Sequence, residues 1–174
     1  VIPWIKSQEY MNRPRRALQV ASLGFDFSVW EIILPFVTGG VLCIPSRGIH
    51  MVGKELRNKI CENSIESLNF TPGNLATLDN EGLDSLNSLL IGGEAYSSEL
   101  IKKWSFGRKY QNVYGPTETT IFATAAPFDE HIKEIHIGRP ITNVQVYILD
   151  KEMRPVPIGC EGELYIGGAG LTRG

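Results

Sequence analysis

The fold is decided by residues 86–118, LNSLLIGGEAYSSELIKKWSFGRKYQNVYGPTE. Leu86–Ile91 is a short apolar run that predicts a buried strand, and it leads directly into Gly92-Gly93-Glu94-Ala95. Ser97 or Ser98 supplies an N-cap, so we expect a helix from there to Trp104. Tyr110–Val113 predicts the next strand. A strand, a helix and a strand in this order predict two parallel strands.

The same alternation extends toward the N-terminus. Strands are expected at Ala17–Ser22 and Ile65–Phe70, a helix leading into a strand at Trp30–Pro45, and helices at Val52–Glu62 and Asn74–Leu78. The sequence therefore predicts an α/β fold with a mostly parallel sheet flanked by helices. Ligands of such sheets bind outside the carboxyl ends of the strands, which is where Gly92–Ala95 and the turn at Asn112–Glu118 are expected.

After Pro127 the pattern changes. Val144–Leu149 is partly alternating and rich in β-formers, Asp150–Pro157 predicts a turn, and Glu163–Ile166 predicts another strand. We expect this part to begin an antiparallel β subdomain, which divides the chain into residues 1–127 and 128–174. Because the chain begins on Val1 rather than Met and ends on Gly-Leu-Thr-Arg-Gly, we expect a segment of a longer protein.

Composition excludes several classes of function. The 174 residues are 43% hydrophobic and 21% charged, which is ordinary for a soluble domain, and a net charge of −2 gives no electrostatic case for nucleic acid or an anionic membrane. The longest apolar run, Ile32–Ile44, is interrupted by Pro35 and is too short to span a bilayer. The widely spaced cysteines argue against a disulfide framework or zinc site and for the reducing cytoplasm, and the histidines form no ligand cluster and are interpreted as incidental; these are Cys43, Cys61, Cys160, His50, His131 and His136.

The turn Asn112–Glu118 carries the residues with the clearest chemistry. Gly115-Pro116 rules out a continuing helix. The Tyr114 ring is suited to stacking on a planar base, the Thr117 hydroxyl to donating to a phosphate oxygen, and the Glu118 carboxylate to binding Mg²⁺. These residue types favour a nucleotide triphosphate as ligand. The alternative is an ordinary surface turn that carries polar side chains.

A second candidate is Asp26, a carboxylate between the aromatic residues Phe25 and Phe27. Burial of an unpaired carboxylate is costly, so Asp26 is expected to have a cationic or hydrogen-bonding partner. The simpler interpretation is an ion pair with one of the seventeen Lys and Arg residues, such as Arg15 or Arg16, and the other is the ammonium group of a ligand.

Neither a phosphate loop nor a hydrolase site is supported by the remaining sequence patterns. Gly167-Gly168-Ala169-Gly170 follows an expected strand but lacks the Lys-Ser/Thr of a phosphate loop, so it is interpreted as a structural turn. No Gly-x-Ser-x-Gly motif or Ser/His/Asp arrangement is present, so hydrolase chemistry has little support.

Together the motifs resemble the adenylation domains of non-ribosomal peptide synthetases, within the superfamily of adenylate-forming enzymes that includes acyl-CoA ligases and luciferases. The resemblance covers nearly the whole chain and rests on FDFSVWE (25–31), GGEA (92–95), NVYGPTETT (112–120), IGRPI (137–141) and GELYIGGAGLTRG (162–174). It implies part of the large N-terminal portion of an enzyme that joins an amino-acid carboxylate to ATP and releases pyrophosphate. The aminoacyl-adenylate would then pass to the phosphopantetheine thiol of a peptidyl carrier protein, beside neighbouring synthetase domains.

The resemblance also assigns roles to residues. Tyr114 would stack on adenine, and Gly93, Glu94, Ala95, Asn112 and Gly115 would line the base and ribose. Thr117 would contact phosphate and Glu118 would hold Mg²⁺, which makes these two the catalytic candidates. Asp26 matches the position that pairs with the α-ammonium of the substrate. The specificity pocket would consist of Asp26, Phe27, Trp30, Asn69, Leu90, Gly92, Val113, Ile121 and Phe122.

This pocket indicates the amino acid. Its first eight positions fit the pattern of threonine-activating domains, whereas Phe122 departs from the usual polar residue at the ninth position. Phe27, Trp30 and Leu90 would shrink the cavity, and Asn69 would hydrogen-bond a side-chain hydroxyl. We therefore expect threonine or a close analogue as substrate.

By the same resemblance, a phosphate loop with its lysine precedes residue 1, and a ribose-binding aspartate and a C-terminal subdomain with its catalytic lysine follow residue 174. The isolated segment is therefore expected to be inactive. One rival is an acyl- or aryl-CoA ligase, which is disfavoured because such an acid brings no ammonium to Asp26. The other is a non-catalytic ATP-binding remnant, which the presence of Thr117 and Glu118 disfavours.

Overall fold

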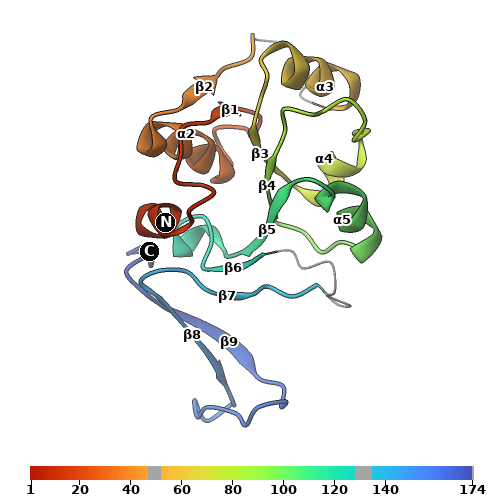
Figure 1. Ribbon diagram of the computed structural model, residues 1–174. Coiled ribbons are helices and arrows are strands. Elements are labelled where there is room, and N and C mark those ends of the chain that lie inside the picture. The colour runs from red at the N-terminus through yellow and green to blue at the C-terminus, as the bar shows by residue number, and fades with distance from the viewer. Residues whose placement is uncertain (47–51, 128–134, 174) are drawn as a thin grey trace.

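The computed structural model describes residues 1–46, 52–127 and 135–173 (Figure 1). The strands are β1 Arg16–Leu18, β2 Val41–Cys43, β3 Ser67–Phe70, β4 Ser88–Gly92, β5 Lys109–Tyr114, β6 Thr124–Pro127, β7 Arg139–Pro140, β8 Val144–Leu149 and β9 Glu163–Gly168. The helices are α1 Ile2–Ser7, α2 Phe27–Thr38, α3 Gly53–Glu62, α4 Pro72–Ala76, α5 Ser98–Ser105 and the 3₁₀ turn η1 Thr117–Thr119.

The main layer is a sheet in the order β2-β1-β3-β4-β5-β6-β7, and β8 and β9 form a separate two-stranded sheet. Strands β1 to β5 are parallel, with helices in the crossovers between them, whereas β6 and β7 continue the sheet antiparallel. This confirms the predicted α/β fold with a mostly parallel sheet followed by antiparallel strands. Ser97 caps α5, as expected, since its side chain accepts a hydrogen bond from the N–H of Leu100.

Strand β1 is shorter than the sequence predicts. It ends at Leu18 rather than Ser22. The N–H groups of Val20 and Ala21 donate to the side chain of Glu31 instead of to a neighbouring strand. A buried carboxylate therefore takes over the backbone hydrogen bonds at the end of this strand.

Helix α2 is longer than the sequence predicts. It begins at Phe27 instead of Trp30 and continues through Pro35 to a left-handed Gly39. Because proline has no N–H, residue 35 cannot donate to the carbonyl of Glu31, and the helix lacks one internal hydrogen bond there. The early start of the helix brings Phe27, Trp30 and Glu31 onto successive turns beside the sheet.

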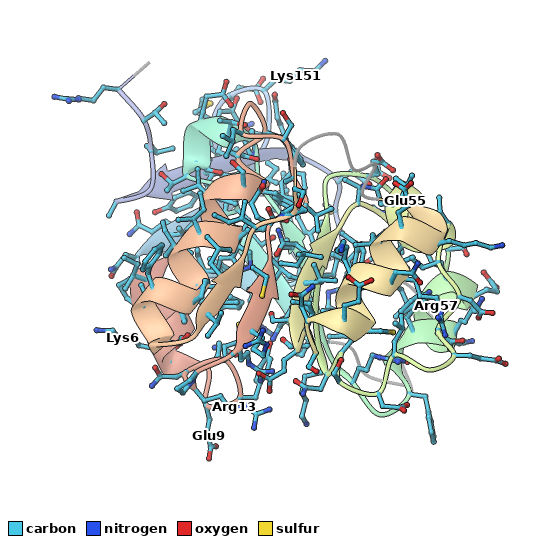
Figure 2. All side chains as sticks on the ribbon, turned by 90° about the horizontal axis from the view of Figure 1, so that it is seen from above. Lys6, Glu9, Arg13, Glu55, Arg57 and Lys151 are labelled. Carbon is cyan, nitrogen blue, oxygen red and sulfur yellow. The ribbon has the colours of Figure 1, made fainter. Side chains whose placement is uncertain are left out.

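Side-chain alternation along the strands separates two apolar cores. In β4, Leu89 and Ile91 pack into the core beneath α3, α4 and α5, whereas Leu90 packs with α1 and α2 on the other face. Figure 2 shows α2 and α3 on opposite sides of the sheet, with labelled charged side chains such as Lys6 and Arg57 projecting outward. The sheet is therefore covered on both faces, as parallel sheets require.

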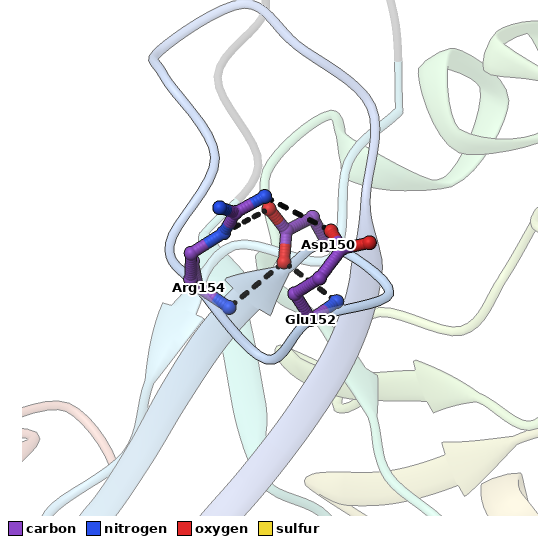
Figure 3. Close-up of polar contacts among 3 residues, drawn as sticks. All are labelled: Asp150, Glu152 and Arg154. Carbon is purple, nitrogen blue, oxygen red and sulfur yellow. Dashed lines mark hydrogen bonds and ion pairs between the residues drawn. The ribbon is translucent and has the colours of Figure 1, made fainter.

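The β8–β9 hairpin projects away from the main sheet (Figure 1). Its connection is held by Asp150, whose carboxylate accepts from the N–H groups of Glu152 and Arg154, both at 2.9 Å, and from Arg154 Nε at 3.0 Å (Figure 3). These bonds lower the pKa of Asp150, and the bond from the backbone N–H of Arg154 has the largest effect. The turn expected at Asp150–Pro157 is thus present.

Two further observations concern the C-terminal part. β9 extends to Gly168, so the turn predicted at residues 167–170 is confined to Ala169 and Gly170. β7 lies after residue 127 yet pairs with β6 in the main sheet, and the division into residues 1–127 and 128–174 stays a prediction. In the described part of the chain, no helix has the length and apolar character needed to cross a membrane.

Candidate functional site

A hollow of about 520 Å³ lies at the carboxyl ends of β4 and β5. It is lined by Gly93, Glu94, Ala95, Tyr96, Asn112, Val113, Tyr114, Gly115, Pro116, Ile135, His136 and Ile137. This lining includes every residue predicted to bind the nucleotide except Thr117. The Tyr114 side chain is 41% exposed, so its ring is accessible to a ligand. The hollow lies at the edge where parallel sheets bind their ligands.

Asn112 forms part of this wall by a structural contact. Its side chain is buried, and its amide donates to the backbone carbonyl of His136 at 2.8 Å. This bond holds the segment 135–137 against β5. His136, interpreted from the sequence as incidental, therefore lines the hollow, and only its position beside the IGRPI motif could have indicated this. His50 and His131 lie outside the described residues.

The turn after β5 is tightly constrained. A Cβ atom at Gly115 would lie 2.6 Å from the backbone of Phe122 and Ala123, so only glycine allows the chain to fold back there. Thr120 and Ile121 both have positive φ, 63° and 75°, which is costly for β-branched residues. Because the strain concentrates beside the candidate catalytic residues, this turn has the character of a functional element.

Contacts from three directions hold the strained turn. The Thr119 hydroxyl donates to the carbonyl of Pro116 at 2.7 Å, and the N–H of Ala123 donates to the carbonyl of Tyr114 at 2.8 Å. From the segment after β9, the N–H of Thr172 donates to the carbonyl of Glu118 at 2.8 Å. The side chain of Glu118 remains exposed.

Glu118 suits a metal that is shared with a ligand. In residues 1–46, 52–127 and 135–173, no group of three or more His, Cys, Asp or Glu side chains could hold a metal ion. Mg²⁺ usually binds one or two carboxylates and completes its shell with water and substrate phosphates. One exposed carboxylate beside the hollow has the chemistry of that kind of site and not of an all-protein metal site.

The predicted specificity residues gather on the other side of β5. Phe27, Trp30, Leu90, Val113, Ile121 and Phe122 belong to one buried cluster. The Phe122 ring packs edge-on against Trp30 and Trp4, with both centroids at 5.3 Å. Phe122, which replaces the usual polar residue of this position, is therefore accommodated by packing against two tryptophan rings.

Asp26 differs from expectation. It is half-buried rather than buried, and it caps the N-terminus of α2 without a side-chain capping bond. Arg15 donates to Asn87 and Tyr10, and Arg16 to Asn63, so neither of these two arginines forms the ion pair considered for Asp26. The partial positive charge at the helix N-terminus and partial solvation stabilise the carboxylate instead.

Sequence reasoning missed Glu31, which is only 2% exposed. Its carboxylate accepts from the N–H of Val20 at 3.0 Å, from the N–H of Ala21 at 3.0 and 3.1 Å, and from Nδ2 of Asn69 at 3.1 Å. Burial raises the pKa of Glu31 to about 7, and the N–H donors oppose that rise. The only signal in the sequence was a glutamate within an otherwise apolar helical stretch.

A larger hollow, of about 840 Å³, lies at the opposite edge of the sheet, before the starts of β1, β4 and β5. Its lining includes Arg15 and Arg108, whose guanidinium groups already donate to Asn87 and to backbone carbonyls. None of the sequence motifs reaches this edge, so the smaller hollow is the candidate site.

Comparison with known proteins agrees with this geometry. A family model described as AMP-binding enzyme matches residues 3–174. One of the linear gramicidin synthase proteins of Brevibacillus parabrevis is 43% identical over 159 residues, which cover 91% of this chain and 2% of that protein. Bacitracin synthase 3 of Bacillus licheniformis is 39% identical over 165 residues, which cover 95% of this chain and 3% of that protein.

A solved structure extends the comparison. A four-domain nonribosomal peptide synthetase bound to AMP and glycine matches with a TM-score of 0.85 and 32% identity, covering 98% of this chain and 13% of that one. These matches confirm the resemblance to the adenylation domains of non-ribosomal peptide synthetases. The chain spans only 2–3% of the length of the two curated relatives.

Proposed function

Because the chain belongs to the AMP-binding enzyme family, we propose that it forms part of an enzyme that activates an amino acid as its aminoacyl-adenylate, using ATP and Mg²⁺. The observation that carries this proposal is that the hollow and the buried apolar cluster meet on β5. Asn112 and Tyr114 line the hollow, and Val113 between them lines the hollow and also belongs to the apolar cluster of the pocket. An amino acid and a nucleotide bound there would meet beside Val113, with the carboxylate near the α-phosphorus.

The proposed reaction depends on alignment of the carboxylate with the α-phosphorus more than on proton transfer. A carboxylate is ionised at neutral pH and attacks phosphorus without a general base. The exposed Tyr114 ring is available to stack on adenine, and the exposed Thr117 and Glu118 side chains are available to a phosphate oxygen and to Mg²⁺. Bound Mg²⁺ would neutralise phosphate charge, and Asp26 would pair with the α-ammonium.

Threonine or a close analogue is the proposed amino acid. Phe27, Trp30 and Leu90 form a buried apolar cluster with bulky side chains, which favours a small amino-acid side chain, and Asn69 is the polar residue among the buried pocket positions. Both NH₂ hydrogens of Asn69 face acceptors in the protein, the Glu31 carboxylate at 3.1 Å and the Phe27 carbonyl at 3.4 Å. Its Oδ1 atom therefore remains to accept from a substrate hydroxyl.

The proposed acceptor of the adenylate is the phosphopantetheine thiol of a peptidyl carrier protein, within a larger synthetase. Support comes from a solved protein with a TM-score of 0.83 and 26% identity that contains adenylation and PCP domains, of which this chain covers 30%. Transfer of radiolabelled amino acid to a holo carrier domain, measured with the full-length protein, tests this step. Labelled adenylate without any loaded carrier would contradict it.

Amino-acid-dependent ATP–pyrophosphate exchange by the full-length protein tests the activation itself. Exchange is expected with threonine, and exchange with a fatty or aryl acid is expected at background. A preference for a bulky aromatic or charged amino acid would contradict threonine alone. Exchange driven by a fatty acid but by no amino acid would contradict adenylation of amino acids.

A further inference from the structure

Glu31 contacts the pocket residue Asn69 and connects three elements of the fold. It stands on α2, accepts from the N–H groups of Val20 and Ala21 at the end of β1, and accepts from the side chain of Asn69 on β3. Every one of these contacts is an N–H donor. Only an acceptor side chain satisfies all of them, because an amide at this position would turn its own NH₂ group toward at least one donor.

This arrangement decides how the Asn69 amide is oriented. The O and N atoms of an amide are distinguished by their partners, and the same end of the Asn69 amide reaches both the carboxylate of Glu31 and the carbonyl of Phe27. Both partners are acceptors. The NH₂ group must therefore point at them, because the inverted amide would place Oδ1 against both the buried Glu31 carboxylate and the Phe27 carbonyl.

The orientation has a consequence for the ligand. Among the described residues, none donates a hydrogen bond to Oδ1 of Asn69. Since the side chain is only 6% exposed, an unpaired oxygen there favours a ligand group that can donate and disfavours one that can only accept.

We propose that Glu31 is a positioning residue that fixes the Asn69 amide, so that the pocket presents an acceptor and selects amino acids whose side chain carries a hydrogen-bond donor. This inference rests on the proposed function and deepens it. Glu31 touches neither substrate nor nucleotide in this assignment. It acts through Asn69, and its contacts with Val20 and Ala21 fix its own rotamer.

The test compares two neutral amino acids of nearly equal shape in the full-length protein. O-methylserine carries an ether oxygen, which only accepts, where norvaline carries a methylene group. Wild type should use O-methylserine less well than norvaline. In Glu31→Gln, the new amide oxygen can serve Val20 and Ala21 while its NH₂ group faces Asn69, which then turns over and offers a donor to the pocket. The ratio of kcat/KM for O-methylserine to that for norvaline should rise at least about fivefold.

Two further variants separate positioning from loss of structure. Glu66→Gln removes another carboxylate that accepts a backbone N–H, that of Arg16 at 3.0 Å, but contacts no pocket residue, so its ratio should equal that of wild type. Asn69→Ala should raise the ratio by itself, and adding Glu31→Gln to it should produce no further change.

An unchanged ratio in Glu31→Gln, or equal effects of Glu31→Gln in the presence and absence of Asn69, overturns the role of Glu31. If Glu31→Gln does not fold, an unchanged ratio in Asn69→Ala still overturns it. Absence of exchange with every amino acid in wild type would instead contradict the proposed function, so the two failures are distinguishable.

Discussion

Gly92 is a position where a single added methyl group should disturb the amino-acid pocket directly. It ends β4, is buried, and pairs in register with Val113 of β5. A Cβ atom at residue 92 would lie 2.5 Å from the carbonyl oxygen of Val113, 2.8 Å from its Cγ2 atom and 3.2 Å from Cζ of Phe27. Ordinary contact begins at 3.4 Å, so all three neighbours are too close.

The size of the effect follows from which atoms can move. The Val113 carbonyl belongs to a central strand and can withdraw only if β5 shifts, so both β5 and the Phe27 ring must move. Added atoms in a packed core typically cost about 1–3 kcal/mol. Both displaced groups are walls of the proposed pocket. A loss of about 1.4 kcal/mol in amino-acid binding corresponds to a tenfold higher KM.

The assay is pyrophosphate exchange by the full-length Gly92→Ala protein, with the KM for the amino acid and for ATP measured separately. The amino-acid KM should rise about tenfold, and the ATP KM should rise by a smaller factor, because the atoms nearest the added Cβ belong to Val113 and Phe27 and not to Tyr114. The matched control is Gly167→Ala in β9, where the added Cβ would meet its nearest atom, Oε1 of Gln145, at 3.9 Å. Wild-type amino-acid KM in Gly92→Ala, or an equal rise in the control, would refute the reasoning.

Three other outcomes are expected for the full-length protein. Tyr114→Ala should raise the KM for ATP about tenfold, since base stacking on an aromatic ring contributes roughly 1–3 kcal/mol, whereas Tyr114→Phe should keep the wild-type value. Glu118→Gln should lower kcat at least about tenfold and raise the Mg²⁺ concentration for half-maximal exchange. The melting temperature should not change, because the Glu118 side chain is exposed. An unaltered Mg²⁺ dependence would exclude Glu118 as a ligand. Because the folded state raises the pKa of Glu31 from its ordinary 4.5 to about 7, the associated stability is present below pH 4.5 and is lost as the pH rises through 7, a fall of up to about 3 kcal/mol. The urea midpoint of Glu31→Gln should lack this part of the pH dependence, and equal slopes for both proteins would contradict it.

The parallel sheet was predictable because its signals are local. Leu86–Ile91 carries enough apolar residues to predict β4, and Ser97 carries the cap that begins α5. The end of β1 was not predictable, because Val20 continues an apolar pattern that favours a strand. A side chain on α2 competes for its N–H group, and such a contact between distant residues leaves no periodic trace in the sequence.

The candidate site divides in the same way. Gly93 and Tyr114 were identifiable because each lies at the carboxyl end of a predicted strand, and these ends of parallel strands meet at one edge of the sheet. Asp26 was misjudged because flanking aromatic residues suggested burial, whereas its place at the start of α2 leaves it half-exposed. Glu31 was missed for the opposite reason: a glutamate in a helix usually faces solvent, and only the packing of α2 on the sheet turns it inward.

The strained turn explains why the segment after β9 matters to the proposed chemistry. Thr120 and Ile121 hold positive φ values that cost of order 1–3 kcal/mol each, and such a conformation persists only where neighbouring contacts enforce it. The Thr120 hydroxyl donates to the carbonyl of Gly170, and the N–H of Thr172 donates to the carbonyl of Glu118. The segment after β9 therefore stabilises the backbone at Glu118, the residue proposed to bind Mg²⁺. A division of the chain before the hairpin would separate that residue from the contacts that position it, so the segment after β9 contributes to the site through its backbone contacts with the turn.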